Sequence, residues 1–249
     1  MNLLGIDIGG SGIKGALVDT STGQLVTNRI RLDTPQPATP KSVAETVARL
    51  AREVGGEGPV GVAFPARVQA GVARTASNID KAFIGTDVDA LLTEATGRGV
   101  HVLNDADAAG LGEVRFGGAR GAKGVALMLT FGTGIGSGLF VDGRLVPNTE
   151  LGHLVLPGGR VAEPYAAERV RKEEKLTWEA WSKRVQEYLD HVEFLFGPDL
   201  IVVGGGVSKP ERWAQFGLFL KTNARLVPAT LGNHAGIVGA ALYAAECEA

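Results

Sequence analysis

A glycine-rich segment that occurs twice is the feature that most constrains how this chain can fold. DIGGSGIKGALVD at residues 7–19 aligns without gaps on TFGTGIGSGLFVD at residues 130–142. From position 7 to position 130 the offset is 123 residues, about half of the 249-residue chain. Each copy has the pattern of two strands joined by a glycine turn. The repeat predicts a duplicated unit of β-meander plus helices, in two lobes around a central cleft. Chance similarity between two glycine hairpins is the alternative.

The composition excludes several classes of protein. Lys plus Arg number 25 and Asp plus Glu number 27, a net charge of −2, so no overall positive field exists to collect nucleic acid or an anionic membrane. No apolar stretch approaches the roughly 18 to 20 residues of a membrane span. A single cysteine, Cys247, excludes a disulfide framework and a cysteine-based zinc site. The N-terminus lacks the basic region of a signal peptide, and we expect a soluble, cytoplasmic protein.

Hydrophobic periodicity predicts strands and helices that alternate in both halves of the chain. The expected strands are residues 2–8, 13–19, 24–32, 60–64, 100–103, 125–131 and 200–203. The expected helices are residues 42–54, 87–96, 161–175, 177–196 and 235–246, with Thr177 as an N-cap. This alternation indicates an α/β fold with mixed sheets.

The first glycine loop consists of Gly9, Gly10, Ser11 and Gly12. It lies between two expected strands, so it is neither a Walker A loop nor a Rossmann fingerprint, which are both followed by a helix. Successive N–H groups at a hairpin tip can form a concave anion site, to which Lys14 can add a positive charge. Asp7 is placed to orient Mg²⁺ through water. An ordinary tight hairpin is the alternative.

Two more glycine runs lie in the second half. The second loop repeats the first arrangement and adds hydroxyl groups; its candidate residues are Thr130, Gly132, Thr133, Gly134 and Gly136. Two such loops facing one cleft could hold a chain of phosphates. The third run, Gly204, Gly205 and Gly206, follows a buried strand and precedes a helix, where a phosphate or a flat ring can rest on exposed backbone. A compact strand-to-helix turn is the alternative there.

Asn104 and Asp105 lie at the expected carboxyl end of a strand, the edge of an α/β sheet where ligands usually bind. If the cleft holds a polyol and a phosphate donor, one carboxylate must accept the hydroxyl proton, and Asp105 is well placed for this. Asp105 could instead cap its helix. Asp107 is less suited, because it lies two residues inside the helix.

Polar side chains that could bind a sugar occur in two further segments. Asn148 to His153 brings together an amide, a hydroxyl, a carboxylate and an imidazole, with Glu150 three residues before His153. His153 alone would more often be a packed surface histidine. Asn78 lies in a similar polar insert and is a weaker candidate on the residues alone.

These motifs resemble, in order along the whole chain, those of the ROK family (repressor, open reading frame, kinase) of sugar kinases. DIGGSGIKG and TFGTGIGSG resemble its two phosphate loops, and GGGVS its motif at the donor end. NDADAA is similar to the stretch with the catalytic base, at Asp105. ELGH and EPYAA are similar to its sugar-binding motifs, at Glu150, His153 and Glu163. The resemblance implies the duplicated, ribonuclease H-like lobes of the actin and hexokinase ATPase superfamily. We place the first lobe at residues 1–110 and the second at 111–249, with the final helix able to pack back on the first.

The chain departs from the family pattern at one place. The cysteine-rich zinc motif that the family carries between ELGH and EPYAA is absent, and residues 156–162 replace it without a cysteine. His153, a metal ligand in zinc-bearing members, must therefore serve the sugar or the fold, and we expect no zinc. The N-terminal helix-turn-helix of the repressor members is also missing, which counts against DNA binding.

SNIDKAFIGTD, PNTELGH and the TWEAW segment resemble the zinc-free branch of the family, the polyphosphate glucokinases. That resemblance implies transfer of a phosphoryl group from inorganic polyphosphate, ATP or both to the 6-hydroxyl of glucose, with Mg²⁺, in a homodimer. The residues around glucose would be Asn78, Asn104, Asp105, Glu150, His153 and Glu163, with Asp105 as the general base. A strictly ATP-dependent hexokinase for glucose or mannose and a non-catalytic sugar sensor are the alternatives.

Overall fold

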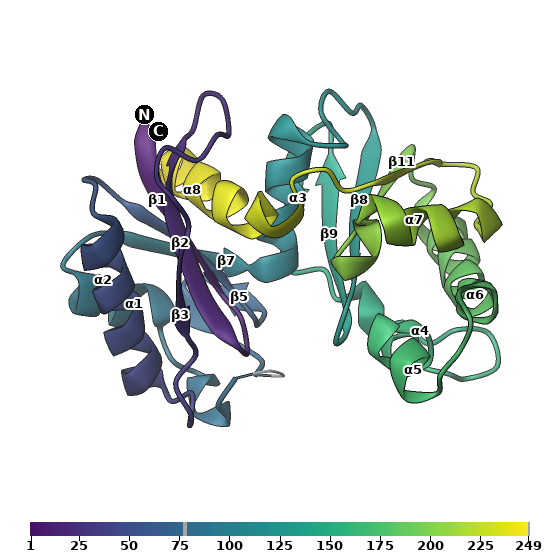
Figure 1. Cartoon of the computed structure of the whole chain (residues 1–249), viewed down its shortest axis with the longest axis horizontal. Helices are drawn as coiled ribbons and strands as arrows, with labels where there is room; N and C mark the ends of the chain where they lie inside the picture. The colour runs from purple at the N-terminus through teal and green to yellow at the C-terminus, as the bar shows by residue number, and fades with distance from the viewer. Residues whose placement is uncertain (77–78, 249) are drawn as a thin grey trace. The chain divides into compact units, whose positions relative to one another are not determined.

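The chain folds into two compact units, each built on a five-stranded sheet (Figure 1). A computed structural model describes residues 1–76 and 79–248. Unit 1 comprises Met1–Gly112 and Asn233–Ala249, and unit 2 comprises Glu113–Gly232. The chain therefore passes between the units twice, after Gly112 and after Gly232. Within the described residues, no helix combines the length and the apolar composition needed to cross a membrane.

The sheet of unit 1 has the strand order β3-β2-β1-β4-β7. Its strands are β1 (Asn2–Ile8), β2 (Gly12–Asp19), β3 (Ile30–Asp33), β4 (Val60–Phe64) and β7 (Val100–Asn104). β1, β2 and β3 form an antiparallel meander, whereas β1, β4 and β7 run parallel. The carboxyl ends of three strands therefore meet at one edge. The short pair β5 (Val68–Gln69) and β6 (Val72–Ala73) is separate from this sheet.

The sheet of unit 2 repeats this plan with the order β10-β9-β8-β11-β12. Its strands are β8 (Val125–Phe131), β9 (Ile135–Val141), β10 (Arg144–Val146), β11 (Leu200–Gly204) and β12 (Arg225–Pro228). β8, β9 and β10 are antiparallel, and β8, β11 and β12 are parallel. The matching orders confirm the duplicated α/β fold with mixed sheets.

The two glycine hairpins differ in register by one residue. Ile8 pairs with Ile13 in the first hairpin, but Phe131 pairs with Ile135 in the second, whose turn is one residue shorter. From Ile13 to Ile135 the offset is 122 residues, and at this offset the buried positions of β2 and β9 coincide. The gapless alignment is therefore wrong for the second strand, because turn length sets the register of a hairpin.

The helices of unit 1 are α1 (Pro40–Val54), α2 (Val88–Thr96), the first part of α3 (Asp105–Phe116) and α8 (Ala235–Cys247). α1 begins where the Thr39 side chain accepts a hydrogen bond from the Ser42 amide. The expected strand at residues 24–32 is wrong for most of its length. Only Ile30–Asp33 pairs in the sheet, and Leu25 makes an isolated bridge with Val18.

The last helix, α8, packs on the first sheet at unusually close range (Figure 1). A Cβ added to Gly5 would lie 2.0 Å from the Ile237 carbonyl oxygen, and one added to Gly61 would lie 1.8 Å from that of Ala240. Gly239 on α8 approaches the Ala108 carbonyl of α3 in the same way. Backbone contacts this close exclude any side chain. Glycine on both partners therefore lets the C-terminal helix complete unit 1.

The helices of unit 2 are α4 (Glu163–Ala166), α5 (Glu168–Glu173), α6 (Trp178–Phe196) and α7 (Pro210–Phe216). The single helix expected at residues 161–175 is wrong, because Ala167 is extended, with φ −61° and ψ 150°, and separates α4 from α5. α6 begins as expected at Thr177, whose side chain accepts a hydrogen bond from the Ala180 amide. On its inner face Trp181 and Tyr188 are fully buried against β8 and pack edge-on against Phe131.

A buried carboxylate joins the first and last residues of unit 2. Glu113 is fully buried, and its carboxylate accepts hydrogen bonds from the Gly118 amide at 2.7 Å and the Leu231 amide at 2.7 Å. The Thr230 amide donates to both carboxylate oxygens, and the Thr230 hydroxyl donates to one of them. The chain passes between units next to both attachment points, so this side chain fixes where the crossings begin.

Gly61→Ala is expected to lower the free energy of unfolding by about 2–3 kcal/mol, because the new methyl overlaps the α8 backbone and forces the helix off β4. Denaturant unfolding measures the change. Gly99→Ala is the matched control, since a Cβ there meets nothing within 4 Å. Equal stability of the two variants would contradict the packing described for α8.

Glu113→Gln is expected to destabilise the fold by about 2 kcal/mol, because an amide NH₂ replaces an acceptor that faces several buried donors. Thermal unfolding compares this variant with Glu211→Gln, which changes an exposed side chain on α7. If the two melt at the same temperature, Glu113 does not hold the ends of unit 2 together.

Candidate active site

In unit 1 the first glycine loop is a tight turn whose carbonyls are held by side chains. The Gly9 amide donates to the Gly12 carbonyl at 3.0 Å and closes the turn. The Gly9 carbonyl accepts from the Thr34 hydroxyl at 2.5 Å, and the Ser11 carbonyl accepts from Arg31 at 2.7 Å. Gly10 and Ser11 at the tip are exposed. The loop thus presents accessible backbone next to the carboxyl end of β1.

Asp7 and Lys14 face each other across the first hairpin. They are paired residues of β1 and β2, and Lys14 Nζ lies 3.2 Å from Asp7 Oδ2. Mg²⁺ is usually held by one or two carboxylates together with waters and substrate phosphates, so Asp7 fits as its protein contact. Lys14 shares that carboxylate and adds positive charge beside the loop. The described residues contain no cluster of three His, Cys, Asp or Glu that could hold a metal by themselves.

At the end of β7, Asn104 caps the following helix α3, and the next residue, Asp105, is exposed. Asn104 Oδ1 accepts hydrogen bonds from the amides of Ala106 at 2.8 Å and Asp107 at 3.2 Å, so Asn104 provides the cap of α3. Asn104 Nδ2 donates to the Ala66 carbonyl at 3.1 Å, which ties the helix start to the end of β4. Asp105 Oδ1 also accepts from the Ala106 amide, at 2.8 Å.

The two acidic side chains at the start of α3 differ in accessibility. Asp105 is exposed, whereas Asp107 is 1% exposed. The positive end of the α3 dipole favours a negative charge at Asp105. Asp105 is therefore the carboxylate that a ligand at this sheet edge can reach. Asn78, the other candidate in this part of the sequence, lies outside the described residues.

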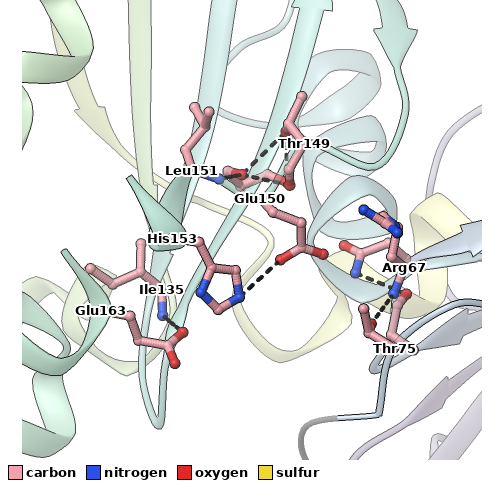
Figure 2. A network of polar contacts seen from close by, with 11 residues as sticks. Arg67, Thr75, Ile135, Thr149, Glu150, Leu151, His153 and Glu163 are labelled. Atoms are coloured by element: carbon pink, nitrogen blue, oxygen red, sulfur yellow. Dashed lines mark hydrogen bonds and ion pairs between the residues drawn. The ribbon is translucent and has the colours of Figure 1, made fainter. Parts of the chain in front are cut away.

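In unit 2 the second glycine loop is bound by Glu163 (Figure 2). The Gly132 amide donates to the Gly134 carbonyl at 2.9 Å, and the Ile135 amide donates to Glu163 Oε2 at 2.9 Å. A Cβ at Gly134 would lie 2.3 Å from the same carboxylate oxygen, so a larger residue there would displace the Glu163 side chain. Glu163 therefore lies directly on the loop, a contact that its sugar-binding motif does not imply.

Glu150 and His153 lie at the ends of one turn beside the second hairpin (Figure 2). His153 Nε2 is 3.8 Å from Glu150 Oε2, and the His153 side chain is 63% exposed. The turn is fixed on β9 because Ser137 Oγ accepts a hydrogen bond from the Leu151 amide at 2.9 Å. The structure therefore brings Glu150 and His153 together and leaves the imidazole open to a ligand.

The third glycine run lies beside the second loop at the carboxyl edge of the sheet. Gly204 pairs with Thr130, and a Cβ on Gly205, which has φ +83°, would lie 2.4 Å from the Phe131 carbonyl oxygen. The Gly206 carbonyl accepts from Arg212 at 3.2 Å. The run is thus both a compact strand-to-helix turn and an immediate neighbour of the second loop.

Residues 156–162, which replace the zinc motif, are held by contacts among arginine, tyrosine and glutamate side chains. Arg160 lies over the ring of Tyr165, 4.2 Å from its centroid, and binds Glu187 at 2.8 Å. The Tyr165 hydroxyl donates to Glu187 at 3.0 Å, and Arg184 donates to the Tyr165 carbonyl at 3.2 Å. Burial and the hydrogen bond to Glu187 raise the pKa of Tyr165. This network holds α4, and with it Glu163, against α6.

Sequence reasoning missed the side chains that grip the glycine loops. Arg31 binds the first loop and Arg169 binds the second, with Arg169 Nε donating to the Thr133 carbonyl at 3.0 Å. Arg169 belongs to the charged stretch ERVRKEEK, a pattern typical of a solvated helix face. No local signal distinguishes such an arginine from its neighbours.

Comparisons with known proteins agree with the motifs. The ROK family model matches residues 3–165. The chain is 49% identical over 240 residues to the polyphosphate glucokinase of Mycobacterium tuberculosis (strain CDC 1551 / Oshkosh), covering 96% of this chain and 89% of that protein.

Two solved structures are similar over the whole chain. The inorganic polyphosphate/ATP-glucomannokinase from Arthrobacter sp. strain KM has a TM-score of 0.92 and 50% identity, covering 99% of both chains. The ROK hexokinase from Thermus thermophilus has a TM-score of 0.77 and 29% identity, covering 100% of both chains. The order of motifs, the duplicated sheets and these similarities lead to one conclusion: the chain belongs to the ROK family of sugar kinases.

Proposed function

We propose that this chain is a glucokinase that transfers a phosphoryl group from inorganic polyphosphate or ATP to the 6-hydroxyl of glucose. The observation that carries the proposal is the exposed Asp105 carboxylate at the carboxyl end of β7, held there by the Asn104 cap. The similarity to a polyphosphate glucokinase and to a polyphosphate/ATP-glucomannokinase supports both donors and this acceptor.

The proposed sugar-binding groups differ in how many contacts they already make within the protein. Glu150 and His153 offer a carboxylate and an exposed imidazole for neighbouring hydroxyls. Glu163 Oε2 is already bound to the Ile135 amide, which leaves Oε1 for a hydroxyl. Asn104 makes three hydrogen bonds within unit 1, so we assign it to the placement of Asp105 as well as to glucose. Asn78 completes the proposed set.

The transfer needs one base and a place for the charge that develops. Asp105 accepts the proton of the 6-hydroxyl as that oxygen forms a bond to the terminal phosphorus and the bond from phosphorus to the donor's bridging oxygen breaks. Backbone amides of the glycine loops donate to the oxygens of the transferring group. Asp107 cannot replace Asp105, because it is buried.

The donor is held by its phosphates. Both glycine loops and the third run present backbone rather than long side chains, and Lys14 supplies a positive charge beside the first loop. Bound Mg²⁺ would neutralise charge on the donor phosphates, and Asp7 is the residue that fits it. A phosphate chain is common to polyphosphate and ATP, so this arrangement serves either donor.

We also propose that the enzyme works as a homodimer, as expected for the family. Unit 2 exposes large apolar side chains that its own core does not cover. Phe194 is 83% exposed and Leu218 is 68% exposed, near the end of α6 and after α7. A second copy is the partner that the family resemblance favours.

A strictly ATP-dependent hexokinase is the second candidate. The similarity to the Thermus thermophilus ROK hexokinase supports hexokinase activity without naming a donor. Both candidates share Asp105 as the base. They differ in the donor and in whether mannose is accepted as well as glucose. A sugar sensor without catalysis would keep glucose binding and transfer no phosphate from any donor.

Asp105→Asn is expected to reduce glucose 6-phosphate formation by about 10²-fold to 10⁴-fold, because the amide cannot accept the hydroxyl proton. A coupled assay measures the rate, and the melting temperature should stay close to that of the wild type. Asp190→Asn changes an exposed acid on α6 and serves as the control. Turnover near normal in Asp105→Asn would reject Asp105 as the base.

Initial rates at fixed glucose with three donors separate the candidate functions. We expect turnover with polyphosphate of defined length and with ATP, and none with ADP, which offers a shorter phosphate chain. Turnover with ATP alone would identify the ATP-dependent hexokinase. Glucose binding without transfer from any of the three would identify a sensor.

A further inference from the structure

Two arginines outside all the family motifs each donate a hydrogen bond to a carbonyl at a glycine loop. Arg31, on β3, donates to Ser11 at 2.7 Å, and Arg169, on α5, donates through Nε to Thr133 at 3.0 Å. The two arginines lie in different units and come from unrelated elements, a strand and a helix. The same contact therefore arises independently at both copies of the loop.

A second carbonyl of each loop also accepts a hydrogen bond from outside the loop. The Gly9 carbonyl accepts from the Thr34 hydroxyl at 2.5 Å, and the Gly132 carbonyl accepts from the Arg169 amide at 2.9 Å. Arg169 alone thus holds two successive carbonyls of the second loop. In the first loop, two residues share this role: Arg31 holds the Ser11 carbonyl and Thr34 holds the Gly9 carbonyl.

Holding a carbonyl also sets the direction of the next amide, because C=O and the following N–H point to opposite sides of a planar trans peptide. The held carbonyls of Gly9, Gly132 and Thr133 therefore turn the amides of Gly10, Thr133 and Gly134 away from the tethers. Within residues 1–76 and 79–248, these three amides donate no hydrogen bond to protein. Gly10 and Thr133 are exposed, so the amides are available to an anion.

Both guanidinium groups lie against the loops and are themselves oriented by acids on their own elements. Arg31 binds Asp33 at 2.6 Å, and a Cβ on Gly12 would lie 2.6 Å from Arg31 Nε. Arg169 reaches Glu173 at 3.4 Å. A planar group with several donors can hold a carbonyl and an acid at once, which a lysine cannot do with the same geometry.

We propose that Arg31 and Arg169 are positioning residues for the phosphate donor. Arg169 fixes the peptides that carry the Thr133 and Gly134 amides. Arg31 acts through the Ser11 carbonyl and fixes the turn that carries the Gly10 amide. The inference rests on the proposed function only in naming that donor as a phosphate chain. It adds two residues that no motif marks and gives each loop its own clamp.

The test measures binding of sodium tripolyphosphate with Mg²⁺ to the full chain by calorimetry, in the absence of glucose. In Arg31→Met and Arg169→Met the dissociation constant should rise about tenfold, and the KM for polyphosphate and for ATP should rise by a similar factor. The KM for glucose should stay within about twofold. Lys183→Met removes an exposed lysine on α6 that pairs with Glu179 and serves as the control.

The dependence of the affinity loss on NaCl concentration distinguishes a positioning role of the arginines from long-range attraction between charges. A hydrogen bond to a carbonyl is hardly screened, so the loss in the methionine variants should be the same at low and high NaCl, whereas a loss from long-range charge shrinks with salt. Unchanged tripolyphosphate affinity, a loss that disappears at high salt, or an equal rise in the KM for glucose would each overturn the proposal. Failure of the proposed function would look different: the wild type would transfer no phosphate, yet the binding measurement would still report on the loops.

Discussion

Parallel pairing of the central strands is the constraint from which the site follows. In unit 1 it brings the ends of β1, β4 and β7 to one sheet edge, and in unit 2 it does the same for β8 and β11. Each candidate loop begins where one of these strands ends. Asp105 follows β7, the first glycine loop follows β1, and the second and third runs follow β8 and β11. Close packing of α8 on Gly5 and Gly61 supports the edge in unit 1.

The proposed recognition through backbone amides would allow the same loops to bind two donors. An amide binds a phosphate oxygen without reading what the phosphate chain is attached to. Glycine is required at Gly205, which lies against the Phe131 carbonyl with positive φ, whereas Gly134 lies directly under the Glu163 carboxylate. Glycine does not restrict the backbone conformation of the loop by itself. The hydrogen bonds from the arginines to the loop carbonyls supply that restriction, so that the amides keep a defined direction.

The sequence allows most strands along the chain, the duplication and the family to be predicted, because glycine turns and apolar runs are local signals. Tertiary contacts decide the remainder. Turn length changed the register of β9, and the break at Ala167 lets the Arg169 amide reach Gly132. The cap of α3 came from Asn104, although Asp105 was an equally plausible cap by residue type. In the sequence, Arg31 and Arg169 cannot be distinguished from ordinary surface charges, because the loop carbonyls that they bind are distant along the chain.

In the proposed mechanism, loop amides hold the phosphate chain while a single carboxylate activates the sugar. A crystal structure with glucose and a non-transferable polyphosphate analogue bound together tests it most directly. We expect the Asp105 carboxylate within about 3 Å of the glucose 6-oxygen and the amides of Gly10, Thr133 and Gly134 on phosphate oxygens. Asp105 turned away from that oxygen, with the phosphates held elsewhere, would contradict it.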